Sequence, residues 1–90
     1  MDNISKRELS PYELIFLNQW QLRFARNMFF AFYRYPFKDE ELFTYFYIYC
    51  EGYDEKSQVP VNHNFSMDLM NPVEKKNVET IRLLEDMVGR

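Results

Sequence analysis

The stretch over residues 10–35, SPYELIFLNQWQLRFARNMFFAFYRY, is the longest continuous pattern in the chain and constrains its fold more than any other segment. Its first residues favour a helix start: Ser10 is a good N-cap, Pro11 suits the first helical position, and Glu13 completes a capping box. Pro36 disfavours helical geometry at the residue before it and has no amide hydrogen to donate. The sequence therefore predicts one long helix over residues 10–35.

Apolar residues cover more than half of the circumference of this predicted helix, which is a wider face than one packing partner needs. The remaining stripe combines arginine with aromatic rings at steps of three and four residues, so its side chains would share one ridge. Such a ridge is either a solvated face with its rings covered by another segment or a surface that binds a partner. The residues of this Arg-aromatic ridge are Tyr12, Phe16, Gln19, Arg23, Arg26, Asn27, Phe30 and Arg34.

Residues 39–51 are compatible with either a helix or a strand. Asp39 is a good helix cap, and Gly52 stands where a helix would end. The alternating pattern over residues 42–50 instead fits a strand, but its only candidate partner, residues 58–65, contains a proline and alternates poorly. We favour the helix because it has both a start and a stop signal, with a β-hairpin of residues 42–50 and 58–65 as the alternative.

A C-terminal helix over residues 72–88 is indicated by signals at both of its ends. Asn71 is a cap, Pro72 suits the first position, and Glu74 supplies the carboxylate of a capping box. Gly89 follows the last apolar position, where glycine commonly ends a helix. This helix has a narrow apolar stripe and is expected to dock on the long helix.

The remaining segments complete the expected organisation. Residues 1–9 are polar and predict a flexible arm, and residues 52–71 have no persistent period and predict a long connection that lies across the core. A chain of 90 residues is expected to form one small domain. The predicted fold class is mostly α: a small bundle of about three helices organised around the long N-terminal helix.

Composition limits the classes of function. The chain has only two glycines, which nearly excludes glycine-rich phosphate-binding loops, and its formal net charge of −3 argues against general electrostatic binding to nucleic acid. A single cysteine, the absence of a signal-peptide core and the absence of a long uncharged run together predict a cytoplasmic protein that does not enter the membrane.

Residues able to perform chemistry are few and isolated. His63 has no second histidine or cysteine at metal-ligand spacing, and Cys50 lies in an apolar stretch typical of a small core residue. The carboxylates near residue 40 suit the first turn of a helix, where the helix dipole favours negative charge. We therefore expect no enzyme activity, no cofactor and no metal site.

Aromatic residues make up 19% of the chain, more than a small core needs, and Tyr, Trp and Arg dominate the energetics of protein interfaces. We expect a non-catalytic protein–protein interaction module that binds a larger protein. Its sharpest form is a small inhibitor or adaptor of the kind that phages and other mobile elements encode. A structural homo-oligomer and a single-stranded nucleic-acid binder that uses the Arg-aromatic ridge are the alternatives.

The contact with such a partner has two candidate surfaces. One is the Arg-aromatic ridge, whose arginines would pair with carboxylates while its rings enter pockets. The other is a set of acidic residues that would imitate nucleic-acid phosphates and block a basic groove. The acidic surface consists of Asp39, Glu40, Glu41, Glu51, Asp54 and Glu55.

Overall fold

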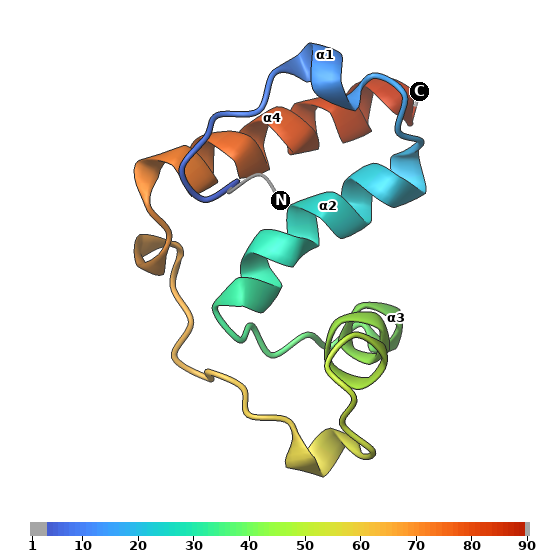
Figure 1. Cartoon of the computed structure of the whole chain (residues 1–90), viewed down its shortest axis with the longest axis vertical. Helices are drawn as coiled ribbons and strands as arrows, with labels where there is room; N and C mark the ends of the chain where they lie inside the picture. The colour runs from blue at the N-terminus through green and yellow to red at the C-terminus, as the bar shows by residue number, and fades with distance from the viewer. Residues whose placement is uncertain (1–3, 90) are drawn as a thin grey trace.

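Helices form the regular elements of the chain in a computed structural model that describes residues 4–89 (Figure 1). In chain order they are α1 (Pro11–Leu14), α2 (Gln19–Phe32), α3 (Glu40–Phe43), the π-helix η1 (Thr44–Tyr49), the 3₁₀-helices η2 (Lys56–Gln58) and η3 (Met67–Leu69), and α4 (Pro72–Val88). The predicted mostly α bundle is confirmed. The alternative hairpin of residues 42–50 and 58–65 is wrong, because residues 4–89 contain no strand and residues 40–49 are helical.

The predicted long helix is divided into two helices, α1 and α2, by a break at residues 15–18. Ser10 forms the expected capping box with Glu13, but a second one begins at Asn18. The Asn18 side chain accepts a hydrogen bond from the Gln21 amide at 2.8 Å, and Gln21 Oε1 accepts one from the Asn18 amide at 3.0 Å. Because these bonds satisfy the amides of a new helix start, the chain leaves α1 and re-enters a helix in a new direction.

The end of α2 also differs from the prediction. The helix stops at Phe32, and Arg34 adopts the left-handed region with φ = 62°. The Arg34 Nε donates to the Pro60 carbonyl at 2.8 Å, and its Nη1 donates to both oxygens of Glu51. This backbone conformation costs a residue with a Cβ about 1 kcal/mol or more. It belongs to a local turn, in which the Tyr35 amide donates to the Phe30 carbonyl at 3.2 Å, that ends the helix before Pro36.

Helix α2 contributes residues to two hydrophobic clusters. In the first, α4 lies along α2 and α1 lies over α4 (Figure 1), with Phe29 and Ile81 completely buried. In the second, α3 and η1 pack against α2 together with the connection that follows them, with Tyr47 almost completely buried. Phe30 contacts both clusters. The described chain is therefore organised around α2, which is shorter than the helix that the sequence predicted.

Residues 4–9 are attached to α4, so the predicted flexible arm is wrong for these residues; residues 1–3 lie outside the described part. The attachment depends on Asn77, which has no exposed surface. Its Nδ2 donates to the carbonyls of Ile4 at 2.9 Å and Arg7 at 3.0 Å, and its Oδ1 accepts from the Leu9 amide at 2.7 Å. These three bonds use both amide hydrogens of Asn77 and one of the two acceptor positions on its side-chain oxygen.

Glu74 provides a second attachment. This carboxylate is 1% exposed and accepts hydrogen bonds from the Ser5 hydroxyl at 2.7 Å, the Tyr33 hydroxyl at 2.5 Å and the Asn71 amide at 2.9 Å. Burial by itself raises the pKa of Glu74, but the three donated bonds outweigh it and hold the pKa below its ordinary value. The bond to this carboxylate is also the main reason why the pKa of Tyr33 is raised.

The C-terminal helix matches its predicted range. It spans Pro72–Val88, with Asn71 as the cap and Glu74 completing the capping box. The preceding connection, residues 52–71, has only the two short 3₁₀-helices. Between residues 4 and 89 no helix combines the length and the apolar character that crossing a membrane requires.

Candidate functional site

The residues of the predicted Arg-aromatic ridge do not form one surface. Tyr12 lies on α1 and Phe16 in the break at residues 15–18, both before α2, and they are 81% and 90% exposed. Gln19 is exposed at the first position of α2. Asn27 is buried and donates to the Arg23 carbonyl, and Phe30 lies half-buried between the two clusters.

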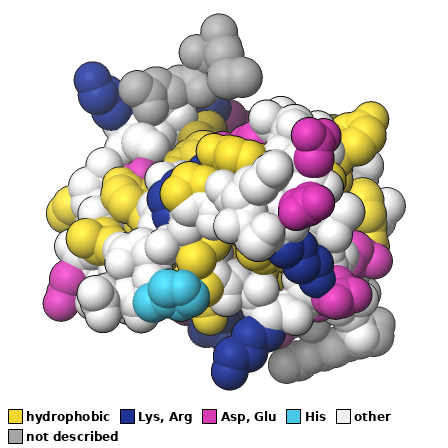
Figure 2. Space-filling view, turned by 90° about the horizontal axis from the view of Figure 1, so that it is seen from below, with side chains coloured by type: hydrophobic (Ala, Val, Ile, Leu, Met, Phe, Trp, Pro, Cys, Tyr) yellow, Lys and Arg dark blue, Asp and Glu magenta, His cyan; other side chains and the backbone are white. Residues whose placement is uncertain are grey.

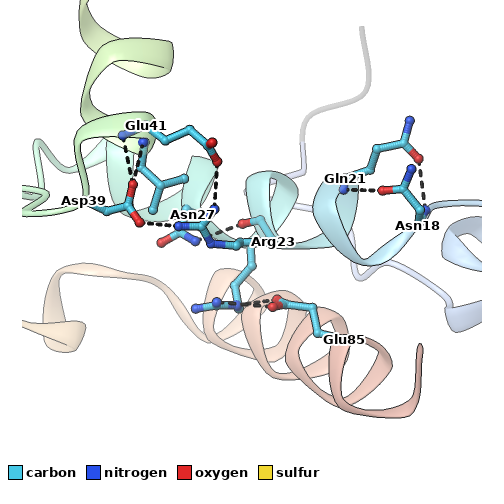
Figure 3. A network of polar contacts seen from close by, with 9 residues as sticks. Asn18, Gln21, Arg23, Asn27, Asp39, Glu41 and Glu85 are labelled. Carbon is cyan, nitrogen blue, oxygen red and sulfur yellow. Dashed lines mark hydrogen bonds and ion pairs between the residues drawn. The ribbon is translucent and has the colours of Figure 1, made fainter. Parts of the chain in front are cut away.

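Two of the ridge arginines are held in ion pairs within the chain (Figure 3). Arg23 donates to Asp39 and, at 3.0 Å, to Glu41, which lie at the start of α3. Arg26 is paired with Glu85 of α4. The hydrogen bond from the Leu42 amide, followed by the charge of Arg23, keeps the pKa of Asp39 below its ordinary value. Arg23 and Arg26 therefore connect α2 to its neighbouring helices.

The third arginine, Arg34, pairs with Glu51 at 2.7 Å, and its guanidinium lies 4.6 Å from the centre of the Tyr47 ring. Burial raises the pKa of Tyr47 to about 12. Lys56 pairs with Glu40. Four of the six predicted acidic residues are thus partners of cations in the same chain, three of them of ridge arginines.

The remaining two acidic residues, Asp54 and Glu55, are exposed and form no ion pair with a described residue. On the face of the molecule that Figure 2 shows, acidic and basic side chains lie side by side toward the right of the view. The two surfaces that the sequence suggested are consequently not separate patches of opposite charge, because two of the ridge arginines pair with three of the acidic residues.

The structure instead brings together a different set of residues, between α2 and η1. On α2, Trp20, Phe24, Met28 and Phe32 follow one another at intervals of four residues, which places them along one ridge. On η1, Tyr45 and Phe46 contact the Phe24 ring of this ridge, and Tyr49 lies beside Tyr45 at the edge of the depression. We call the depression between the two sets the aromatic groove.

Two hollows form the aromatic groove, and they meet at Met28, Tyr45 and Phe46, which line both. The first has a volume of about 430 Å³ and extends toward Phe32, Cys50 and the Arg34–Glu51 pair. The second has a volume of about 390 Å³ and extends toward Trp20. These volumes lie at the lower end of the range typical of ligand pockets.

The rings of the groove divide into a buried floor and an exposed rim. Phe24 and Phe46 form the floor and are 7% and 9% exposed. On the rim, Trp20 is 54% exposed and Tyr49 is 79% exposed. The rim rings rest on the structure beneath them: Trp20 and Phe24 have centroids 4.3 Å apart, and Tyr45 meets the Phe24 ring edge-on at 4.8 Å.

Tyr45 and Tyr49 extend the rim along η1. Their rings are nearly parallel, with an interplanar angle of 15° and a centroid separation of 6.1 Å. The two rings belong to a π-helical segment, in which the Cys50 amide donates to the Tyr45 carbonyl five residues earlier. Single π-turns inside helices occur frequently at functional sites, so the unusual backbone and the exposed rings coincide.

The groove is nearly neutral. Among the residues that line its two hollows only Arg34 and Glu51 carry charge, and they are paired with each other. Cys50, a free and exposed thiol, also lines the first hollow. Within residues 4–89 no three His, Cys, Asp or Glu side chains gather closely enough to hold a metal ion.

Sequence reasoning missed the groove, although one signal for it was present. None of its residues on α2 or η1 was among the predicted site residues. The signal was the excessive width of the apolar face on α2, of which the structure buries only a part.

The fold and the groove define a small helical domain with an exposed, neutral, aromatic surface. The chain belongs to the YARHG domain family, whose model matches residues 1–86. Comparison with curated proteins and with solved structures found no match.

Proposed function

We propose that the chain is a non-catalytic interaction module that binds an apolar segment of a larger protein in the aromatic groove. The observation that carries this proposal is the exposure of Trp20 and Tyr45, which line the two hollows, and of Tyr49, whose ring lies parallel to that of Tyr45. Exposed aromatic rings supply large apolar contact area with few rotatable bonds, and Tyr and Trp are enriched among the residues that dominate binding energy. A small inhibitor or adaptor that covers a surface of its partner is the form of this function that we propose.

The ion pairs of the ridge arginines favour the binding of a protein over the binding of a nucleic acid. A single-stranded nucleic acid needs cations beside stacking rings to neutralise its phosphates. Arg23, Arg26 and Arg34 already have carboxylate partners, and freeing them would expose those carboxylates to the same phosphates. Membership of a family of small domains is consistent with a binding module.

A displayed library of random peptides tests the proposal without knowledge of the natural partner. Peptides selected on the wild-type protein are then measured against Trp20→Ala and Tyr49→Ala. We expect each substitution to weaken binding by about tenfold or more, since truncation of a central aromatic anchor typically costs above 1 kcal/mol. Leu83→Ala is the matched control, because Leu83 is 50% exposed on α4 and lies outside the groove.

Two results would contradict the proposal. One is a set of selected peptides whose affinity is the same for wild type, Trp20→Ala and Tyr49→Ala while circular dichroism shows all three to be folded. The other is a wild-type dimer, measured by sedimentation, that these two substitutions convert to a monomer. In that case the groove is an interface between two copies of the chain, and the structural homo-oligomer replaces the interaction module.

A further inference from the structure

The rim of the aromatic groove carries hydrogen-bond donors that the chain itself does not use. The indole N–H of Trp20 and the hydroxyls of Tyr45 and Tyr49 form no hydrogen bond with any residue between 4 and 89. In the free protein these donors face water. A segment that covers the rim must replace that water, because a buried donor without an acceptor costs binding energy.

The charge of the groove restricts the occupant further. The paired Arg34 and Glu51 leave no uncompensated charge along either hollow. A charged side chain entering the groove would lose its hydration without meeting a counter-charge. The complementary segment is therefore uncharged and apolar, and it also offers acceptors to the rim.

Backbone conformation distinguishes the segments that meet both conditions. An α-helix uses its interior carbonyls in its own hydrogen bonds, so it has few acceptors left for the rim. A polyproline II segment makes no internal hydrogen bonds and leaves each carbonyl free, while its proline rings are apolar. Grooves lined by aromatic residues that bind proline-rich segments exploit this combination.

We propose that the aromatic groove binds an uncharged, proline-rich segment of the partner in the polyproline II conformation. This inference rests on the proposed function and specifies the chemistry of the partner at the same site. Proline rings lie against Trp20 and the stacked Tyr45–Tyr49 pair, and the segment's carbonyls accept from the three rim donors. Little conformational entropy is lost, since the segment already populates this conformation when free.

The chain carries two natural reporters of groove occupancy. Trp20 is its only tryptophan and Cys50 its only cysteine, and both line the groove. The probe is a capped, uncharged synthetic peptide of repeated Pro-Pro-Leu-Pro units, and its control replaces each proline by alanine. We expect the proline peptide to change Trp20 fluorescence saturably, with a dissociation constant below about 1 mM, and to slow alkylation of Cys50. The alanine peptide should do neither.

Substitutions of Tyr49 distinguish the contribution of its ring to peptide binding from the contribution of its hydroxyl. Tyr49→Phe keeps the ring and removes one hydroxyl, so it should lower the affinity for the proline peptide by about two- to tenfold, the usual range for one hydrogen bond. Tyr49→Ala should weaken it more, and Leu83→Ala should leave it unchanged. Tyr49 is largely exposed, so these variants are expected to stay folded, which circular dichroism checks.

Failure of this inference can be told apart from failure of the proposed function. If library peptides bind the groove but lack proline, and the alanine peptide binds as well as the proline peptide, the polyproline inference is wrong while the interaction module stands. If the proline peptide binds without protecting Cys50 and without sensitivity to Tyr49→Ala, it binds elsewhere and the inference is equally overturned. If no peptide of any class depends on the groove, both proposals are wrong.

Discussion

Replacing Asn77 by alanine should remove the larger of the two attachments of residues 4–9 to α4 and leave the bond between Ser5 and Glu74. The substitution deletes three hydrogen bonds of 2.7 to 3.0 Å, two donated by the amide to Ile4 and Arg7 and one accepted from Leu9. At about 1 kcal/mol for each bond, the free energy of unfolding should fall by about 3 kcal/mol. For a domain of this size that loss corresponds to a decrease in melting temperature of roughly 12 to 24 °C.

Urea unfolding followed by circular dichroism measures this loss, with Asn64→Ala as the control. Asn64 is exposed and its substitution should change stability by less than about 0.5 kcal/mol. Trypsin provides a second measurement, because Lys6 and Arg7 lie in the attached segment and should be cleaved faster in Asn77→Ala. A loss below about 1 kcal/mol together with unchanged cleavage would show that Asn77 does not hold the segment.

Three further predictions concern other buried or constrained residues. The pKa of Glu74 is lower in the folded protein than in the unfolded chain, so its contribution to stability is present above the unfolded pKa, near 4.3, and is lost as the pH falls through the folded pKa. Urea midpoints measured from pH 6 down to about pH 3 should therefore decline less steeply in Glu74→Gln than in wild type. Equal slopes for the two proteins would contradict this. Both Arg34→Gly and Arg34→Ala lose the bonds to Glu51 and Pro60, but only glycine accepts φ = 62° without strain. The glycine variant should therefore be more stable than the alanine variant by about 1 kcal/mol in thermal melts. Equal stability of the two variants would argue against backbone strain at this position. Asn18→Ala removes the cap of α2 and should cost about 1 kcal/mol in urea unfolding, whereas an unaltered midpoint would show that the break at residues 15–18 does not depend on this cap.

Helix starts were predictable where several local signals agree. Asn71, Pro72 and Glu74 each favour the same start, and α4 begins and ends within the predicted range. The start of α1 at Pro11 was predicted for the same reason. A cap is a contact between residues two or three apart, so the sequence contains all that is needed to recognise it.

The start of α2 was missed because its cap uses residues that are also compatible with a helix interior. Gln21 is a good helix former, and Asn18 lies within an apolar pattern that continues on both sides. An uninterrupted helix and two capped helices are therefore both consistent with the local sequence. Packing of α1 against α4 accompanies the second arrangement, and that contact is not visible in periodicity.

The candidate site was less predictable than the fold for a similar reason. Which rings of α2 stay exposed depends on where η1 crosses the helix, and Tyr45 and Phe46 meet Phe24 there through contacts some twenty residues apart in the chain. Arg23 and Arg26 lie on α2 and Arg34 follows it, but their partners Asp39, Glu51 and Glu85 lie elsewhere in the chain. Side-chain pairing across elements decides whether a charged ridge is available to a partner.

The attachment of residues 4–9 also has a consequence for the order of folding. Asn77 joins groups that are 68 to 73 residues away in the sequence, so its three hydrogen bonds to residues 4–9 cannot form during synthesis until α4 has left the ribosome. The entropic cost of closing so long a loop grows only slowly with its length. The stabilising contacts between residues 4–9 and α4 nevertheless form only after the loop has closed. The second cluster, built from α2, α3, η1 and residues 53–61, needs no such closure and can form on the emerging chain. The part of the chain that carries the aromatic groove can thus pack before residues 4–9 reach α4.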